Sequence, residues 1–357
     1  MLPIFSSQAE ITVTAIVPQS ETYEKQGKEL LSGIHKAIDE INTQGGILGE
    51  KVNLLPVDDQ CNDSISISTA QMLSLLKDKK ISLVIGPYCA NSFDEVADIY
   101  AKAQIFQIIP TAINYTQAKT IKKGLIKMLG YTSQEALDFF NHYNKTFAGK
   151  NVAVISKEDD IESMEEANAI IKEFARHGKS ILIKLYTYEE TKKDYDTLAD
   201  KVFSDKNQIA FLLGTAKNIR KMARALKEKD DEFVIFTNKY LATQDYFDYL
   251  GRLADGTYFM ELRGRNDDPD FAETLVKLRL SGFEAEGLSI YGYSAVKLWE
   301  QLVKKAKSFN YNKLAAIAND KNIKTEFGNK MFHNGAPRIN EPYAIFKYQN
   351  GEYEKVY

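Results

Sequence analysis

A chain of 357 residues, of which 44% are hydrophobic and 27% are charged, is long enough for two domains that each have their own core. Its formal net charge of -3 and pI near 6.0 argue against nucleic acid or an anionic membrane as a partner, because either would favour a basic excess. No stretch of the sequence approaches the roughly 18 apolar residues that are needed to span a bilayer.

In the first third of the chain, apolar runs alternate with amphipathic stretches, which is typical of α/β units around a parallel sheet. A helix is predicted over 27–42 because Leu30, Ile34 and Ile41 recur on one face at helical spacing. The same reasoning predicts further helices over 66–76 and 94–103, and strands over 11–17, 52–57, 82–85 and 107–109.

The pattern begins again near residue 152 and continues to about residue 236. Two successive series of this kind predict two open sheets with helices on both faces, and ligands of such sheets bind beyond the carboxyl ends of the strands. The second series predicts strands over 152–155, 181–186, 209–213 and 233–236, and helices over 164–177, 194–203 and 218–229.

The last third has a different pattern. A strand over 256–260 is followed by helices over 270–281 and 288–308, and then by a tail that turns at Asn334 and Gly335 before a strand over 343–347. We expect these pieces to form no sheet of their own. They are best explained as additions to the two lobes, so the chain must cross between the lobes more than once.

The N-terminal nine residues fit the end of an export signal. Small residues at Ser7 and Ala9 suit a signal-peptidase site, and Leu2-Pro-Ile-Phe5 suits the end of the apolar part of a signal. The alternative is a frayed start to the chain.

The two cysteines, Cys61 and Cys89, each fall just after a predicted strand, so both could project from the same sheet edge. Such a pair in an exported protein predicts a disulfide, and the alternative is two unrelated buried thiols. No metal site is expected, because no C-x-x-C or H-x-x-x-H spacing accompanies the cysteines, and no cofactor is predicted.

The run over 37–49, AIDEINTQGGILG, is the most specific signal in the chain. A helix ends at Asn42, and Gly45 and Gly46 supply a left-handed cap and a tight return into the strand over 52–57. A phosphate-binding loop would need glycines that open a helix, and these close one.

The order of features from this run onward resembles the branched-chain amino-acid-binding proteins of bacterial ABC transporters. That family shows an N-x-x-G-G-I-x-G run and then a strand that ends in paired acids, matched here by Asp58 and Asp59. Cys61, the strand that ends at Ile85-Gly86-Pro87, Cys89, a helix and a strand closed by Pro110 follow in the same order. The resemblance covers residues 11–348 and is strongest up to about Thr116.

The resemblance implies the type I periplasmic binding protein fold, an α/β fold of two Rossmann-like lobes joined by three crossover strands, with the ligand cleft between them. We place the crossovers near 129–131, 251–254 and 337–341. The N-terminal lobe would then comprise residues 10–129 and 255–336, and the C-terminal lobe 130–254 and 337–357.

The resemblance also implies a function. It predicts a non-enzymatic solute-binding protein that captures a small molecule for the membrane permease of an ABC transporter. Such a protein is expected in the periplasm or elsewhere outside the cytoplasm, with a membrane-anchored lipoprotein as one form, and to act as a monomer without a cofactor or nucleic acid.

Three pocket positions depart from the family. Relatives that bind amino acids hold the ligand with a serine after the second cysteine, a threonine past the third-strand proline and an acid in the second lobe. Here Ala90, Ile113 and Lys239 stand at these places. A lysine would repel an ammonium group and favour an anion, so we expect an organic acid or a non-standard amino-acid-like ligand rather than Leu, Ile or Val, unless Asp159 or Asp160 binds the ammonium group.

The residues that we expect to line the cleft follow the strand ends and the family positions. They are Gln26, Tyr88, Ala90, Asn91, Ser92, Thr111, Ala112, Ile113, Asn114, Ile161, Thr215, Lys239, Tyr240 and Tyr291.

Two other functions fit the sequence less well. A ligand-sensing domain of a receptor, or an amide sensor, would have the same fold but a signalling protein as its partner. An α/β enzyme would need a catalytic motif, and the sequence has no G-x-S-x-G elbow, no G-x-x-x-x-G-K-S/T loop and no H-E-x-x-H.

Overall fold

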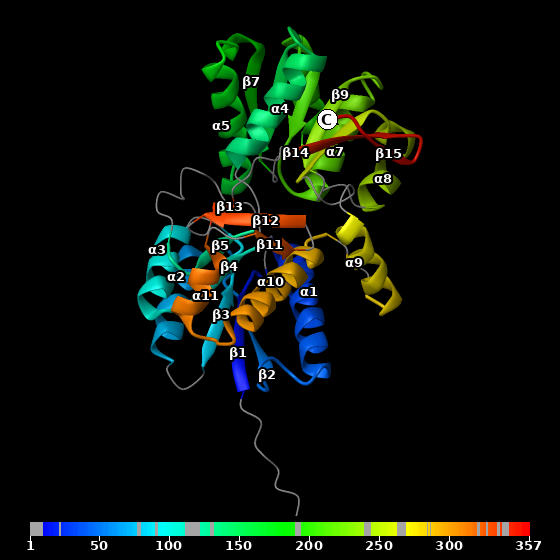
Figure 1. Ribbon diagram of the computed structural model, residues 1–357. Coiled ribbons are helices and arrows are strands. Elements are labelled where there is room, and N and C mark those ends of the chain that lie inside the picture. The colour runs from blue at the N-terminus through cyan, green and yellow to red at the C-terminus, as the bar shows by residue number, and fades with distance from the viewer. Residues whose placement is uncertain are drawn as a thin grey trace, which may run out of the picture. The chain divides into compact units, whose positions relative to one another are not determined.

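The computed structural model divides the chain into two compact units (Figure 1). The first comprises residues 1–130 and 264–339, and the second comprises residues 131–263 and 340–357, so the chain passes between the units three times. The structure describes residues 10–20, 23–76, 80–89, 92–110, 122–128, 132–189, 194–238, 244–262, 269–283, 285, 287–319, 322–325, 328–333, 336–337 and 343–357.

The first unit contains a five-stranded parallel sheet in the order β2-β1-β3-β4-β5. Its strands are β1 (Glu10–Ile16), β2 (Lys51–Val57), β3 (Ile81–Ile85), β4 (Phe106–Ile109) and β5 (Leu125–Lys127). Strands β4 and β5 are buried along their whole length, and β1 and β3 are buried except near their first residues, as expected of parallel strands covered on both faces by helices, whereas the edge strand β2 is mostly half-buried.

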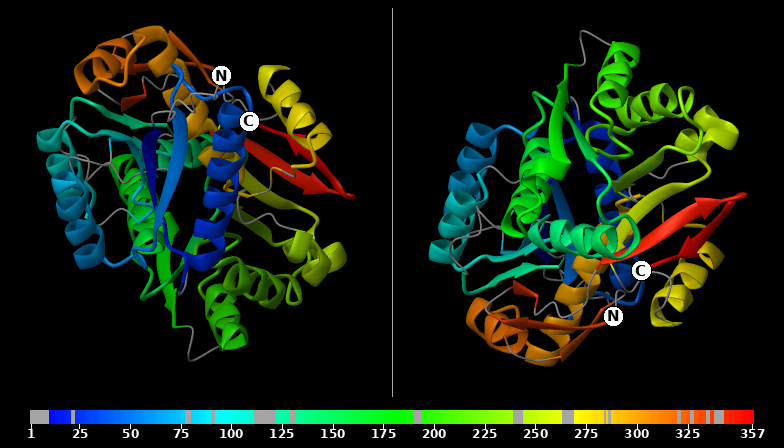
Figure 2. Two further views of the ribbon diagram at one scale, coloured as in Figure 1. Left: turned by 90° about the horizontal axis from the view of Figure 1, so that it is seen from below. Right: turned by 90° about the horizontal axis from the view of Figure 1, so that it is seen from above.

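Helices cover both faces of this sheet. On one face, α2 and α3 pack against β1 and β3 through Leu73, Val84 and Tyr100, and α1 lies on the opposite face (Figure 2), where it packs along α10. The described helices of this unit are α1 (Glu24–Thr43), α2 (Asp63–Leu75), α3 (Phe93–Ala103), α9 (Pro269–Leu280), α10 (Ser289–Ala306) and α11 (Tyr311–Ala318).

The second unit contains a seven-stranded sheet in the order β15-β14-β10-β9-β8-β6-β7. Strands β6 to β10 run parallel, and β14 and β15 are antiparallel additions beside β10. The strands are β6 (Val152–Lys157), β7 (Ile183–Tyr188), β8 (Ile209–Leu212), β9 (Val234–Asn238), β10 (Thr257–Leu262), β14 (Tyr343–Gln349) and β15 (Glu352–Lys355).

Two apolar layers stabilise this second sheet. Aromatic residues of α4 and α5, including Phe139 and Phe174, pack on one face, and α6, α7 and α8 pack on the other through residues such as Met222 and Tyr246. The helices are α4 (Thr132–Thr146), α5 (Ile161–Arg176), α6 (Tyr195–Ser204), α7 (Ala216–Lys227) and α8 (Gln244–Leu250), with short 3-10 helices at Ser180–Leu182 and Gly251–Ala254.

The glycine-rich run after α1 ends the helix, as predicted. Helix α1 ends at Thr43, and Gly45 and Gly46 have φ values of +94° and +86°, which L side chains rarely adopt. The side chain of Asn42 then fixes the next strand, because its Nδ2 donates to Val52 O at 2.8 Å and its Oδ1 accepts from Val52 N at 2.9 Å. The run is therefore a helix stop.

The predicted disulfide is confirmed, since Cys61 and Cys89 are bonded, with Cα atoms 5.3 Å apart. The two cysteines follow β2 and β3, which are not neighbours, because β1 lies between them in the sheet. The bridge therefore links the loops that flank the carboxyl end of β1.

Two predictions about the last third were wrong. Residues 255–263 were placed in the first lobe with a crossover at 251–254, but Gly251–Ala254 is a 3-10 helix of the second unit. The strand that follows, β10, pairs with β9 and β14 in the second sheet. The last third also has a sheet of its own, in the order β11 (Asn322–Thr325), β12 (Gly328–His333) and β13 (Ala336–Pro337).

Candidate functional site

Paired acids follow β2 at the carboxyl edge of the first sheet, and both hold loops in place. Asp58 accepts hydrogen bonds from Gln19 N at 2.9 Å, Ser20 Oγ at 2.6 Å and Gln60 N at 2.9 Å. Burial alone would raise the pKa of Asp58, but these donors outweigh it and lower the pKa. Asp58 thus ties the loop after β1 to the loop after β2.

Asp59 faces inward beside Asp58. It is buried, and its oxygens accept from Ser66 Oγ at 2.8 Å and Cys61 N at 3.3 Å. Burial raises the pKa of Asp59 even though these bonds favour the ionised form. The oxygens of Asp59 thus contact the loop after β2 and helix α2. Both Asp58 and Asp59, the paired acids of the family pattern, therefore have a structural role.

Two predicted cleft residues of the first unit lie at this same edge. Tyr88 follows β3 and is nearly buried, with its ring centroid 5.9 Å from that of Tyr23. Ser92 is the buried residue before α3. Both positions fit the expectation that ligand residues follow strand ends. The neighbouring candidates Ala90, Asn91, Thr111, Ala112, Ile113 and Asn114 lie outside the described residues.

The remaining first-unit candidates, Gln26 and Tyr291, are on helices. Gln26 is half-buried in the first turn of α1, and Tyr291 is buried near the start of α10. Both helices begin near the positions that the sequence indicated, so these two residues remain predicted ligand residues.

Lys127 is a residue at this edge that sequence reasoning missed. It ends β5 and is only 2% exposed, with its Nζ 4.7 Å from the centroid of the Phe93 ring. Burial lowers the pKa of Lys127 to about 8, while the charge of Asp94 on α3 favours the protonated form. The three-residue strand β5 gave no periodic signal, so nothing in the sequence marked this lysine.

In the second unit, the predicted residues lie at the starts of helices that follow β6 and β8. Ile161 is the first residue of α5, and Thr215 is the half-buried residue before α7. Lys239 and Tyr240 come directly after β9 and lie beyond the part of the chain that the structure describes.

The two acids that were considered as ammonium ligands are both engaged. Asp160 is buried before α5 and accepts from Ser163 Oγ at 2.6 Å. Asp159 is exposed and lies 3.4 Å from the Nζ of Lys157.

Glu135 and Glu166 form a buried carboxyl pair near the end of β9, and the sequence did not predict this pair. Glu166 on α5 accepts from the Nδ2 of Asn238 at 2.9 and 3.1 Å. Burial raises the pKa of Glu166 to about 7, and burial beside Glu166 and Asp138 raises the pKa of Glu135 on α4 well above its usual range. Asp138 also accepts from the backbone N of Tyr343 at 2.7 Å. Glu166 therefore holds Asn238, the residue before Lys239.

These raised pKa values predict that the protein loses stability as the pH rises. The unfolded chain releases its glutamate protons near pH 4.5, whereas the folded protein keeps them to about pH 7 or above. The free energy of unfolding should therefore fall between pH 5 and pH 8, by about 1–3 kcal/mol. Glu135→Gln, which removes one of the two titrating groups and keeps an amide donor for Glu166, should reduce this fall in urea unfolding followed by circular dichroism.

The exposed Glu232 provides a control for this experiment, and Glu232→Gln should leave the pH dependence unchanged. If Glu135→Gln shows the same fall as the wild-type protein, Glu135 is not one of the titrating groups.

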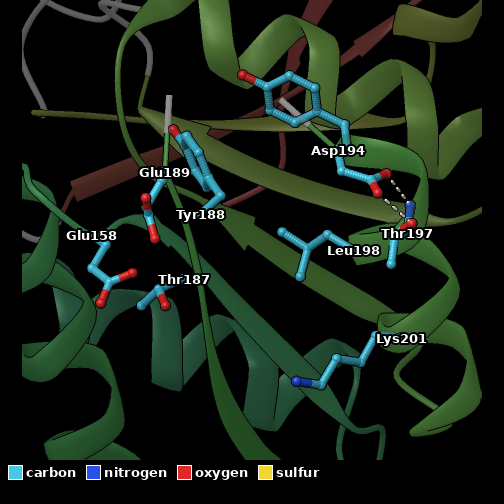
Figure 3. Close-up of a pocket in the computed structure, with 9 residues that line it drawn as sticks. Glu158, Thr187, Tyr188, Glu189, Asp194, Thr197, Leu198 and Lys201 are labelled. Carbon is cyan, nitrogen blue, oxygen red and sulfur yellow. Dashed lines mark hydrogen bonds between the residues drawn. The ribbon is translucent and has the colours of Figure 1, made fainter. Parts of the chain in front are cut away.

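A pocket of about 300 Å³ opens in the second unit, where β6 and β7 end and α6 begins (Figure 3). Its walls carry acidic, aromatic and basic side chains. They include Glu158, Tyr188, Glu189, Asp194, Tyr195 and Lys201. None of these residues was predicted to bind a ligand, because the order of strands β6 and β7 at the sheet edge is not visible in the sequence.

Among the residues that the structure describes, no helix is long and apolar enough to cross a membrane. Within the same set, no three His, Cys, Asp or Glu residues are grouped so that they could hold a metal ion.

The chain forms two α/β units and passes between them three times, and polar residues follow the ends of the parallel strands in each unit. This is the architecture of two-lobed ligand-binding proteins. The chain belongs to the periplasmic binding protein family, whose model matches residues 10–352. The resemblance that the sequence predicted is therefore confirmed, and the fold is that of the type I periplasmic binding proteins.

Individual relatives span nearly the whole chain. A Leu/Ile/Val-binding protein of Rhizobium johnstonii is 24% identical, with 97% of this chain and 94% of the relative covered. The leucine-binding protein of Thermotoga maritima has a similar structure, with a TM-score of 0.80 at 17% identity and coverage of 97% and 98%. A solute-binding protein of an R. palustris ABC transporter, in complex with benzoate, gives a TM-score of 0.78 at 15% identity, with coverage of 98% and 96%.

Proposed function

We propose that this protein is a non-enzymatic solute-binding protein outside the cytoplasm, which holds a small molecule between its two units and delivers it to the permease of an ABC transporter. The observation that carries the proposal is the match of the periplasmic binding protein family across both units. Relatives that bind amino acids and a structural neighbour that belongs to an ABC transporter support it. The protein would act as a monomer and need no cofactor.

The ligand is proposed to be an organic acid or a non-standard amino-acid-like compound rather than Leu, Ile or Val. Lys239 stands where amino-acid-binding relatives have an acid, and a dry cleft that lacks a counter-charge would bind an ammonium group poorly. Asp160, the alternative acid, already accepts from Ser163. The neighbour that binds benzoate, an acid without an ammonium group, supports this choice.

Lys239→Met is expected to weaken the binding of an acid by about 100-fold or more, because removing one partner of a buried charged pair costs about 3–5 kcal/mol. Benzoate is the first acid to test, by titration calorimetry, and its neutral analogue benzamide should be affected little. The matched control is Lys172→Met, which removes an exposed lysine from α5 of the same unit.

Leucine, isoleucine and valine test the ligand class directly. None is expected to bind with a dissociation constant below about 1 μM, which corresponds to roughly 8 kcal/mol. Submicromolar binding of any of them would contradict the assignment of an acid and leave the solute-binding function in place. If no acid, amino acid or amide raises the melting temperature at high concentration, the solute-binding proposal itself is in error.

A further inference from the structure

The pocket between β7 and α6 is a separate feature of the second unit. It lies beside β7, one of the two edge strands of the sheet. Thr215 is the predicted ligand residue of this unit whose side chain the structure describes. It does not line the pocket. Its volume of about 300 Å³ is at the lower end of the range for small-molecule sites.

The charge of the described pocket wall is strongly one-sided. Glu158, Glu189 and Asp194 contribute three carboxylates, and Lys201 contributes a single ammonium group (Figure 3). Asp194 stays ionised, because the hydroxyl and the backbone amide of Thr197 donate to it at 2.7 and 2.9 Å and lower its pKa. The wall therefore attracts cations and repels anions.

Two aromatic rings complete the wall in fixed positions. The ring centroids of Tyr188 and Tyr195 lie 5.9 Å apart at an interplanar angle of 56°. Each hydroxyl is anchored, since Tyr188 donates to Leu213 O at 3.2 Å and Tyr195 donates to Asn218 Oδ1 at 3.0 Å.

The residue at 214 must be glycine for Tyr188 to take this position. A Cβ atom on Gly214 would lie 2.1 Å from the hydroxyl oxygen of Tyr188, and the φ of +140° is itself unfavourable for other residues. The position of the Tyr188 ring thus depends on the backbone at the end of β8, which is separated from β7 in the sheet by β6.

We propose that this pocket is a second binding site, which takes a small organic ammonium ion. Two inclined aromatic rings with carboxylates nearby attract such an ion through cation–π and charge–charge interactions, and Leu198 offers apolar surface to its carbon atoms. The ligand class is opposite in charge to the acid proposed for the site between the units, so the two sites would take different molecules. The proposal does not depend on the identity of that acid.

Choline is the probe, and 3,3-dimethylbutan-1-ol, its uncharged analogue of the same shape, is the matched control ligand. In titration calorimetry at low salt, choline should bind saturably and at least about tenfold more tightly than the alcohol. Choline binding should weaken as salt is added, because the carboxylates are near the surface. Equal binding of the two probes, or no saturable choline binding, would overturn the proposal.

Variants locate the site. Tyr188→Leu and Glu158→Gln should each weaken choline binding by at least about fivefold, and Lys201→Gln should strengthen it, because the opposing charge is removed. Glu352→Gln, which removes an exposed carboxylate on β15 of the same unit, should have no effect. General unfolding would weaken choline binding in every variant. Because Lys201→Gln is expected to strengthen it, unfolding cannot explain the results of the three pocket variants together. Choline binding that none of the three pocket variants changes would refute the assignment.

Discussion

Gly33→Ala is expected to destabilise the first unit by about 2–3 kcal/mol, although alanine favours a helix by about 1 kcal/mol over glycine. A Cβ atom on Gly33 would lie 1.8 Å from the carbonyl oxygen of Ser289, and one on Gly292 would lie 2.2 Å from that of Leu30. Both obstacles are backbone atoms, so no side-chain rotation relieves them, and α1 and α10 would have to separate.

The measurement can be confined to the first unit. Trp299 is the single tryptophan of the chain and is fully buried on α10, so its fluorescence during urea unfolding follows the helix that the added methyl group would displace. Ser32→Ala is the matched control, because Ser32 is exposed on α1 and its hydroxyl donates only to Glu29 O of the same helix. It should change stability by less than about 0.5 kcal/mol. Equal stability of Gly33→Ala and wild type would mean that the helices are not in this close contact.

Local patterns in the sequence predicted most of the regular structure. The strands and helices of both series have local signatures, such as the apolar face of α1 and the glycines that end it, and they lie within a few residues of the predicted bounds. Elements with weak local signals were missed. They are β5, α4, α8, α11, β11 and β15.

The assignment of β10 failed for a different reason. Its residues predict a strand correctly, but which sheet accepts it depends on β9 and on β14, a strand more than eighty residues away along the chain. A strand pattern carries no information about such a partner, so the lobe boundary could not be placed from residues 251–263 alone.

The same limit applies to the candidate site. Positions that follow strand ends, such as Tyr88 and Thr215, could be predicted because the fold class places ligands there. The contact between Glu166 and Asn238 joins residues 72 apart, and that between Asp138 and Tyr343 joins residues 205 apart. Acidic residues on two amphipathic helices look solvated in the sequence, and only the packing of α4 on α5 buries them together.

Replacing both Cys61 and Cys89 by serine is expected to lower the free energy of unfolding of the first unit by roughly 3 kcal/mol. The bridge joins residues 28 apart, and in the chain-entropy model a loop of this length restricts the unfolded chain by about that amount. The loops that it links follow β2 and β3 and carry Asp58 and Tyr88, so the loss should also loosen the carboxyl edge where ligand residues are proposed. Urea unfolding followed by Trp299 fluorescence measures the first effect.

Reductant provides the control for the disulfide. Dithiothreitol should destabilise the wild-type protein by the same amount as the double substitution, and it should leave the Cys61→Ser/Cys89→Ser variant unchanged, because the variant has no bond to reduce. The structure places the two Cα atoms 5.3 Å apart, within the usual range for a bridge. Titration of the unfolded, unreduced protein should therefore detect no free thiol, and two reactive thiols would show that the bridge does not form.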